Sequence, residues 1–157
     1  MQTALAEPDF LTKIASPQEA VSRIAQLREK GPVVFTNGVF DVLHRGHATY
    51  LAQARSLGAS LVVALNTDAS SKRLGKGDDR PLNTLEDRVA LMAALGSVSL
   101  VTWFDEDTPL NAILASRPEV LVKGGDWPVE KMVGAKEVVD WGGRAVSIQF
   151  EHERSTT

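Results

Sequence analysis

Short apolar runs that alternate with amphipathic stretches constrain the fold more than any other feature of this sequence. The clearest run is Leu61–Leu65, a continuous LVVAL segment with a polar residue at each end. A run this short and this apolar is typical of a strand that is buried on both faces of a sheet. Comparable runs recur along the chain, and we expect five strands, at residues 33–36, 61–65, 98–103, 120–122 and 144–148.

The segments between these runs have helical spacing and helical end signals. Ser16-Pro17-Gln18-Glu19 is a capping box with proline at the first helical position. Residues 69–83 differ, because they are polar and contain two glycines and a proline; they predict a long loop with a helical turn at its start. We expect helices over about 17–30, 47–57, 84–95, 109–116 and 129–141, the last weakened by Gly134.

The alternation of strands and helices predicts an α/β domain with a parallel sheet. Right-handed crossovers then favour a Rossmann-like, doubly wound, five-stranded sheet in the order 3-2-1-4-5, with helices on both faces. We expect residues 1–15 to form an N-terminal arm and residues 16–157 to form a single domain. In this order the first and fourth strands are neighbours at the switch point, where ligands bind beyond the carboxyl ends of the strands.

The most unusual segments of the chain fall at the carboxyl ends of the expected strands. The first strand leads into NGVFDVLHRGH, the fourth into KGGDW and the fifth into FEHERSTT. His44 and His47 can each donate a hydrogen bond to a phosphate oxygen, either neutral or charged. Gly46 leaves space for a ligand, and a helix that starts near His47 would direct its first N–H groups at an anion. These residues predict a site for phosphate.

Further cations accompany this segment, and each has a plainer interpretation that the residues leave open. Lys123 precedes two glycines, while Arg73, Lys76 and Arg80 belong to the polar loop, where they could be only solvated charges. The two histidines could bind a metal or be structural. Asp68 could cap a helix and Trp127 could pack on the core.

The spacing of these residues resembles a known signature. Gly38-Val39-Phe40-Asp41 followed by His44-Arg45-Gly46-His47 is similar to the G-x-F-D-x-x-H-x-G-H motif of the cytidylyltransferase-like nucleotidyltransferase superfamily. Within it, FTNGVFDVLHRGH, RPLNTLEDR and VKGGDW resemble the D-glycero-β-D-manno-heptose 1-phosphate adenylyltransferases. That activity occurs alone or beside a sugar kinase, and because no kinase domain fits in 157 residues, the chain resembles the standalone form. The resemblance covers about residues 16–157.

The resemblance implies roles for residues that match the motifs. As catalytic residues we expect His44 and His47, together with Lys76 or Arg80, of which one reaches the phosphates. As nucleotide-binding residues, besides the two histidines, we expect Asn37, Gly38, Val39, Phe40, Gly46, Arg88, Lys123, Gly124, Ser155 and Thr156. As residues that bind the second substrate we expect Asp41, Asn66, Asp68, Lys123, Asp126 and Trp127.

The reaction that the resemblance implies joins ATP and a heptose 1-phosphate to give ADP-heptose, a precursor of the lipopolysaccharide inner core, and pyrophosphate. Mg²⁺ would bridge the phosphates, and we expect no metal site made by the protein alone. Three other functions stay open. They are a cytidylyltransferase for glycerol 3-phosphate or a related polyol or amino-alcohol phosphate, a nucleotide-binding module without turnover, and a hydrolase with a metal on His44 and His47.

Composition excludes several function classes. The net charge of −3 argues against a nucleic-acid partner, and the absence of cysteine excludes disulfides and thiolate catalysis. The sequence has neither a secretory h-region near its start nor an apolar run of roughly 20 residues that could span a membrane. These features predict a cytoplasmic protein whose partners are small molecules, ATP and a sugar phosphate. They leave the oligomeric state open, a homo-oligomer included.

Overall fold

The computed structural model describes residues 3–75, 77, 79–125 and 127–150. Its strands form a single sheet in which every neighbouring pair is parallel, in the order β3-β2-β1-β4-β5. The predicted fold class and strand order are therefore confirmed. The strands are β1 (Val33–Gly38), β2 (Ser60–Asn66), β3 (Leu100–Phe104), β4 (Val120–Gly124) and β5 (Arg144–Ile148).

Six α-helices and two 3₁₀ turns connect and flank these strands in the described residues. Ser16 and Thr84 cap their helices through side-chain oxygens that accept from backbone N–H groups in the first turn. The expectation of one helix over 129–141 is wrong, because Gly134 adopts a left-handed φ of 88° and separates a 3₁₀ turn from a short helix. Nowhere in this part of the chain is a helix long and apolar enough to cross a membrane. The α-helices are α1 (Pro17–Arg28), α2 (Arg45–Arg55), α3 (Asp68–Arg73), α4 (Leu85–Ala93), α5 (Leu110–Ser116) and α6 (Ala135–Asp140), and the 3₁₀ turns are η1 (Asp9–Lys13) and η2 (Val129–Lys131).

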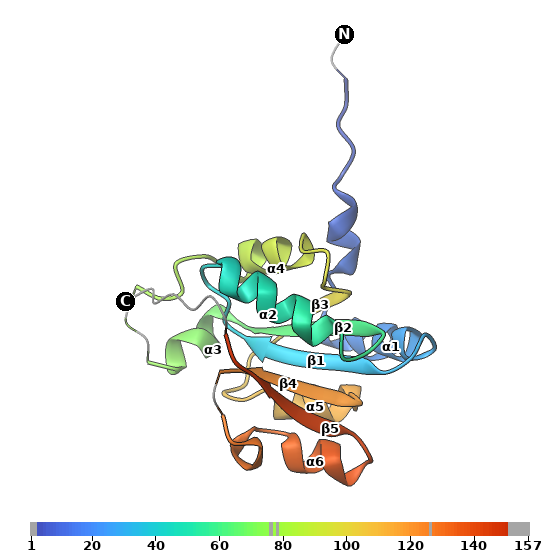
Figure 1. The fold of residues 1–157 in the computed structure, drawn as a ribbon. Helices are drawn as coiled ribbons and strands as arrows, with labels where there is room; N and C mark the ends of the chain where they lie inside the picture. The colour runs from blue at the N-terminus through green and yellow to red at the C-terminus, as the bar shows by residue number, and fades with distance from the viewer. Residues whose placement is uncertain (1–2, 76, 78, 126, 151–157) are drawn as a thin grey trace.

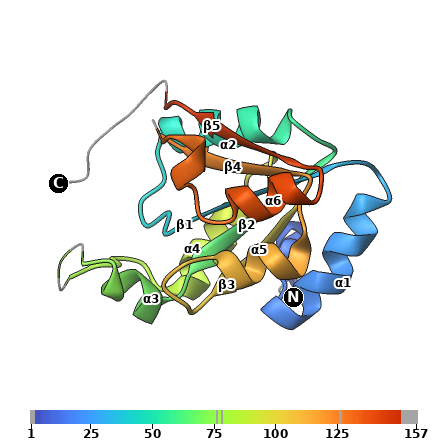
Figure 2. The ribbon, with the colours of Figure 1, turned by 90° about the horizontal axis from the view of Figure 1, so that it is seen from below.

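The sheet is the middle of three layers (Figures 1 and 2). Alternate side chains of each strand point to opposite faces. Val33 and Phe35 of β1 join a core cluster with α1, α5 and α6, whereas Val34 joins a second cluster with α2 and α4. Because both faces are covered at the centre of the sheet, β1, β2 and β4 are largely apolar there, although the buried Thr36 lies within β1.

Part of the segment expected as an arm packs against the edge of the sheet. Ala15 donates its backbone N–H to the carbonyl of Val101, and Ile14 pairs with the same residue as a parallel bridge. Lys13 adds a side-chain hydrogen bond to the carbonyl of Leu95. These contacts protect the edge of β3, which would otherwise be an open template for pairing. Residues 3–8 lead away from the domain (Figure 1), and Leu5 among them is 92% exposed.

Candidate active site

A cleft of about 600 Å³ opens at the carboxyl ends of β1 and β4. These two strands are direct neighbours, with Val34 opposite Val120 and Phe35 opposite Leu121. The cleft therefore lies at the switch point of the sheet, where parallel α/β domains bind ligands. Its walls include Gly38, Phe40, His44, His47, Arg80 and Lys123.

The turn from β1 into α2 fixes the orientation of both histidines. His44 is the N-cap of α2, and its Nδ1 accepts from the N–H of Gly46 at 3.0 Å. His47 Nδ1 accepts from the N–H of His44 at 3.3 Å, and the two rings lie 4.0 Å apart. Because Nδ1 is the acceptor in both rings, a neutral imidazole carries its proton on Nε2. Both side chains can thus offer an Nε2–H donor to a ligand.

His47 acts as a neutral group at physiological pH. Burial, and secondarily the nearby His44, lower the pKa of His47 to about 4. Burial disfavours the charged imidazolium, and a second positive charge beside it would be unfavourable as well. His47 therefore contributes a directed hydrogen bond to a bound anion, and any positive charge in the cleft must come from other residues.

Two aromatic rings enclose His47. Phe40 and Phe150 each meet the imidazole edge to face, with ring centroids 5.4 Å and 5.8 Å away. Each ring also occupies the space above a glycine. A Cβ placed on Gly38 would lie 2.9 Å from the ring of Phe40, and one on Gly124 would lie 2.7 Å from the ring of Phe150. Phe40 itself has a left-handed φ of 48°, a conformation that concentrates at ligand sites.

Asp41 anchors the segment that carries Arg80. Its carboxylate accepts from the N–H of Leu82 at 2.7 Å, from the N–H of Asn83 at 2.9 Å and from Arg80 at 3.3 Å. The Asn83 amide donates in return to the carbonyl of Asp41. Burial would raise the pKa of Asp41, but these hydrogen bonds outweigh it and hold the pKa below its ordinary value. Asp41 is therefore ionised and committed to the 80–83 segment.

Arg88 lies beneath the cleft and does not line it. The residue is 1% exposed, and its guanidinium donates to the carbonyls of Val39, Asn66 and Asn83. A further donor reaches Asp68 Oδ1 at 2.6 Å. Val39 directly follows β1, and Asn66 is the last residue of β2. Asp68 is the first residue of α3, and Asn83 precedes α4. One buried cation thus joins the loops that build the site.

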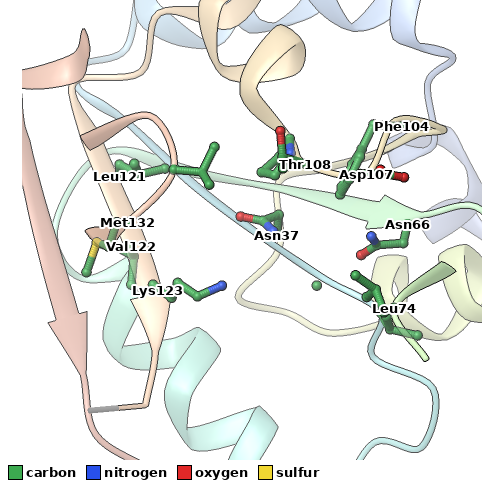
Figure 3. Close-up of a pocket in the computed structure, with 14 residues that line it drawn as sticks. Asn37, Asn66, Leu74, Phe104, Asp107, Thr108, Leu121, Val122, Lys123 and Met132 are labelled. Carbon is green, nitrogen blue, oxygen red and sulfur yellow. The ribbon is translucent and has the colours of Figure 1, made fainter. Parts of the chain in front are cut away.

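Lys123 is the last residue but one of β4 and borders two cavities. It lines the cleft, and it also lines an adjoining cavity of about 280 Å³ that shares Asn37, Gly38 and Val39 with the cleft (Figure 3). Its Nζ lies 5.2 Å from the ring centroid of Trp127, a distance that permits a cation–π contact. Trp127 is 47% exposed and lines neither cavity.

The structure brings together most of the residues expected in the site. Asn37 to Asp41, both histidines, Arg80, Lys123 and Gly124 line the cleft, and Asn66 lines the adjoining cavity. Lys76, Asp126, Ser155 and Thr156 lie outside the described residues. Sequence reasoning missed Phe150, Asp107 and Thr108, although all three follow the carboxyl end of a strand, which was an available signal.

Paired N–H donors at a helix start, beside cations at a switch point, are typical of sites for nucleotide phosphates. Together with the Rossmann-like sheet, they are the features of a nucleotidyltransferase. The chain belongs to the cytidylyltransferase-like family, which residues 35–155 match.

Curated relatives agree with this assignment. The chain is 58% identical over 148 residues to D-beta-D-heptose 1-phosphate adenylyltransferase of Bordetella bronchiseptica, covering 94% of this chain and 91% of that one. It is 48% identical over 145 residues to bifunctional protein HldE of a Marinomonas species and 49% identical to that of Salmonella dublin. In each of these two comparisons the match covers 92% of this chain but 30% of the longer protein.

Solved structures share the fold at lower identity. A lipopolysaccharide core biosynthesis protein from Thermoplasma volcanium superposes with a TM-score of 0.65 at 24% identity, covering 79% of this chain and 99% of that one. Pantoate-beta-alanine ligase from Francisella tularensis superposes with a TM-score of 0.61 at 13% identity, covering 89% of this chain and 67% of that one. Both show the fold alone.

Proposed function

We propose that this protein is a heptose 1-phosphate adenylyltransferase. It transfers AMP from ATP to D-glycero-β-D-manno-heptose 1-phosphate and gives ADP-heptose and pyrophosphate. The observation that carries this proposal is the 58% identity to a relative of that name over nearly the full length of both chains. The cleft supports it, because its donors and cations suit two phosphorylated substrates. Since the reaction uses ATP, we also place the protein in the cytoplasm.

The reaction requires no general base from the protein. An oxygen of the acceptor phosphate, already ionised at neutral pH, attacks the α-phosphorus of ATP. A new P–O bond forms, the bond from the α-phosphorus to the β-phosphate oxygen breaks, and pyrophosphate leaves with its electron pair. Catalysis then consists of positioning and of stabilising charge that develops on phosphate oxygens.

The described residues divide this work between directed donors and positive charge. His44 and His47 present Nε2–H donors at the start of α2, where the helix dipole also favours an anion. Lys123 supplies a cation from β4, and Arg80, held by Asp41, supplies another from the 80–83 segment. We propose that the histidines hold the ATP phosphates and that Lys123 holds the α-phosphate and the acceptor phosphate together.

We propose that Mg²⁺ would be held by the substrate phosphates and not by a cage of protein ligands. In the part of the chain that the structure describes, no three metal-ligating side chains gather. Among the described residues lining the cleft, the carboxylate is Asp41, and its oxygens accept hydrogen bonds from the 80–83 segment. These residues fit a Mg²⁺ held mainly by phosphate oxygens, as is usual for this ion. When bound, Mg²⁺ supplies neutralisation of phosphate charge.

A pyrophosphate-release assay tests the proposal. Purified protein is supplied with ATP or CTP and with either D-glycero-β-D-manno-heptose 1-phosphate or glycerol 3-phosphate. We expect the highest kcat/KM with ATP and the heptose phosphate. Faster turnover with CTP and glycerol 3-phosphate would assign a different transferase activity. No release with any pair would indicate a binding module without turnover.

A further inference from the structure

A further groove, the α1–α5 groove, lies on the face of the sheet that α1 and α5 cover. It encloses about 320 Å³ between these two helices and the carboxyl end of β3. The two helices are neighbours and pack on the same core cluster (Figure 2). None of the described residues that line the groove also lines the cleft. Sites for small organic ligands begin at about this size, near 300 Å³.

The floor of the α1–α5 groove is apolar except for one hydroxyl. Ile24, Phe35 and Phe104 line it and are 1–3% exposed. Thr102 lines it as well, and it lies on the same face of β3 as Phe104, because alternate side chains of a strand share a face. Thr102 is 3% exposed, and its Oγ1 has no hydrogen-bond partner in the part of the chain that the structure describes. A buried hydroxyl without a partner costs free energy, which a bound polar group would recover.

Carboxylates mark the end of the groove that lies beyond β3. Asp105 and Glu106 directly follow the strand, line the groove and are exposed. Its lining includes no lysine, arginine or histidine among the described residues. Arg73 donates to the backbone carbonyl of Asp105, but its Nε is paired with the carboxylate of Asp107. A phosphate or carboxylate ligand would therefore meet like charges here, whereas an ammonium group would meet two carboxylates.

The distance between these two polar features sets the length of a ligand that reaches both. Asp105 lies three positions after Thr102, which corresponds to about 10 Å at the rise of a β-strand. The helical walls between them are apolar, with Val21 from α1 and Ala112 and Ala115 from α5. A matching ligand has an ammonium group at one end, an apolar body and a hydroxyl at the other end. A phenol ring with an ethylamine arm has this order of groups and about this length.

We propose that the α1–α5 groove is a binding site for a small aromatic amine that carries a hydroxyl group. The ammonium group lies at Asp105 and Glu106, the ring lies between the two helices, and the hydroxyl lies at Thr102. This binding is independent of the proposed transfer reaction, which uses residues of the cleft.

Three probe compounds of similar shape test the chemistry of the groove by isothermal titration calorimetry. Tyramine has all three features and should bind the wild-type protein. In 4-hydroxyphenylpropionate a carboxylate replaces the ammonium group, and its affinity should be lower by about tenfold or more. Phenethylamine lacks the hydroxyl, and its affinity should be several-fold lower than that of tyramine.

Matched variants on α5 test the location. Ala115 lines the groove and is exposed, whereas Leu114 is 43% exposed and lines neither the groove nor the two cavities at the cleft. Ala115→Trp should fill the groove and lower the affinity for tyramine by about tenfold or more, and Leu114→Trp should leave it unchanged. Thr102→Val keeps the shape of the side chain and should remove the difference in affinity between tyramine and phenethylamine. This variant keeps the test decisive if Ala115→Trp does not fold.

Several outcomes would overturn the proposal. They are the absence of tyramine binding by the wild-type protein, equal affinity for tyramine and 4-hydroxyphenylpropionate, and an unchanged preference for tyramine over phenethylamine in Thr102→Val. Analytical ultracentrifugation adds one more. A dimer that Ala115→Trp dissociates and Leu114→Trp does not, in a protein that fails to bind tyramine, would assign the groove to a contact between two copies of the chain.

Discussion

The histidine turn, residues 44–47 at the start of α2, and the segment at residues 80–83 both bring candidate phosphate-binding groups to the cleft, but they are held in different ways. In the histidine turn, the side-chain hydrogen bonds join residues two or three positions apart, between Gly46 and His44 and between His44 and His47. The 80–83 segment is held by Asp41, which lies 39 to 42 residues away in the sequence. The histidines are therefore oriented by residues within their own turn, whereas the segment depends on a distant carboxylate.

Arg88 links these two regions. It donates to the carbonyl of Val39 beside the turn and to the carbonyl of Asn83 in the segment. The comparison thus predicts three classes of variant. A substitution at Arg88 should destabilise both regions. A substitution of a histidine in the turn should lower turnover with little loss of stability, and a substitution of Asp41 should act mainly through the position of Arg80.

The largest effect is expected from Arg88→Met. The substitution leaves the carbonyls of Val39, Asn66 and Asn83 and the carboxylate of Asp68 without a guanidinium partner that is itself 1% exposed, and the loss of several such charged hydrogen bonds is expected to cost about 3–5 kcal/mol of unfolding free energy. Urea denaturation measures this value. Arg73→Met is the control, because Arg73 pairs with the exposed Asp107 and its loss should cost about 1 kcal/mol or less. Similar costs for both variants would mean that the two regions are held independently of Arg88.

His47→Ala should lower kcat by roughly a hundredfold or more, because it removes a preorganised donor to the phosphates. The melting temperature should change much less than in Arg88→Met, since the imidazole lies at the cleft and its hydrogen bonds are local. Pyrophosphate release and a thermal melt of the same sample separate the two effects. A fully active variant would show that the histidine turn is structural and would end the mechanism proposed above.

Asp41→Asn should lower activity by about tenfold, because an amide matches two backbone donors and a guanidinium less well than a carboxylate does. If Asp41 acts by positioning Arg80, the double variant with Arg80→Ala should be no less active than Arg80→Ala alone. A double-mutant cycle on kcat/KM for ATP measures this coupling. Additive losses would show that Asp41 has a separate role, such as contact with a substrate.

The smallest expected effect is a difference in pH dependence between the two regions. The folded protein keeps His47 neutral down to about pH 4, whereas the unfolded chain protonates it near pH 6.5. Between these values the unfolded state binds more protons, so stability contributed by His47 falls as pH falls from 6.5 toward 4. The pKa of Asp41 is lowered instead, so its contribution is present above pH 3.8 and is lost only as pH falls below that value.

Hydrogen exchange can separate these two pH windows. The N–H of His44, which donates to His47 Nδ1, reports on the turn, and the N–H groups of Leu82 and Asn83 report on the segment. Protection at His44 should weaken first on acidification, and His47→Gln should remove that early step. Simultaneous loss of protection in both regions would show that they open as one unit.

The same difference explains how much of the molecule could be predicted from sequence. The strand order and the histidine turn follow from alternating patterns and local spacing, and both were predictable. The contacts of Asp41 with residues 82 and 83 were not, because nothing local indicates which distant backbone a carboxylate will meet. Arg88 was accessible in part, since it lies four residues before Met92 and so on the buried face of α4.

The aromatic rings that enclose His47 link two distant positions in the chain. Phe40 fills the space above Gly38, Phe150 fills the space above Gly124, and both rings rest against the same imidazole. A methyl group added at either glycine would force the ring above it to move, and each ring is also a neighbour of His47, although the glycines belong to different strands. We therefore expect each glycine and its ring to be coupled in evolution, so that a larger residue at the glycine is tolerated only with a smaller residue in place of the phenylalanine.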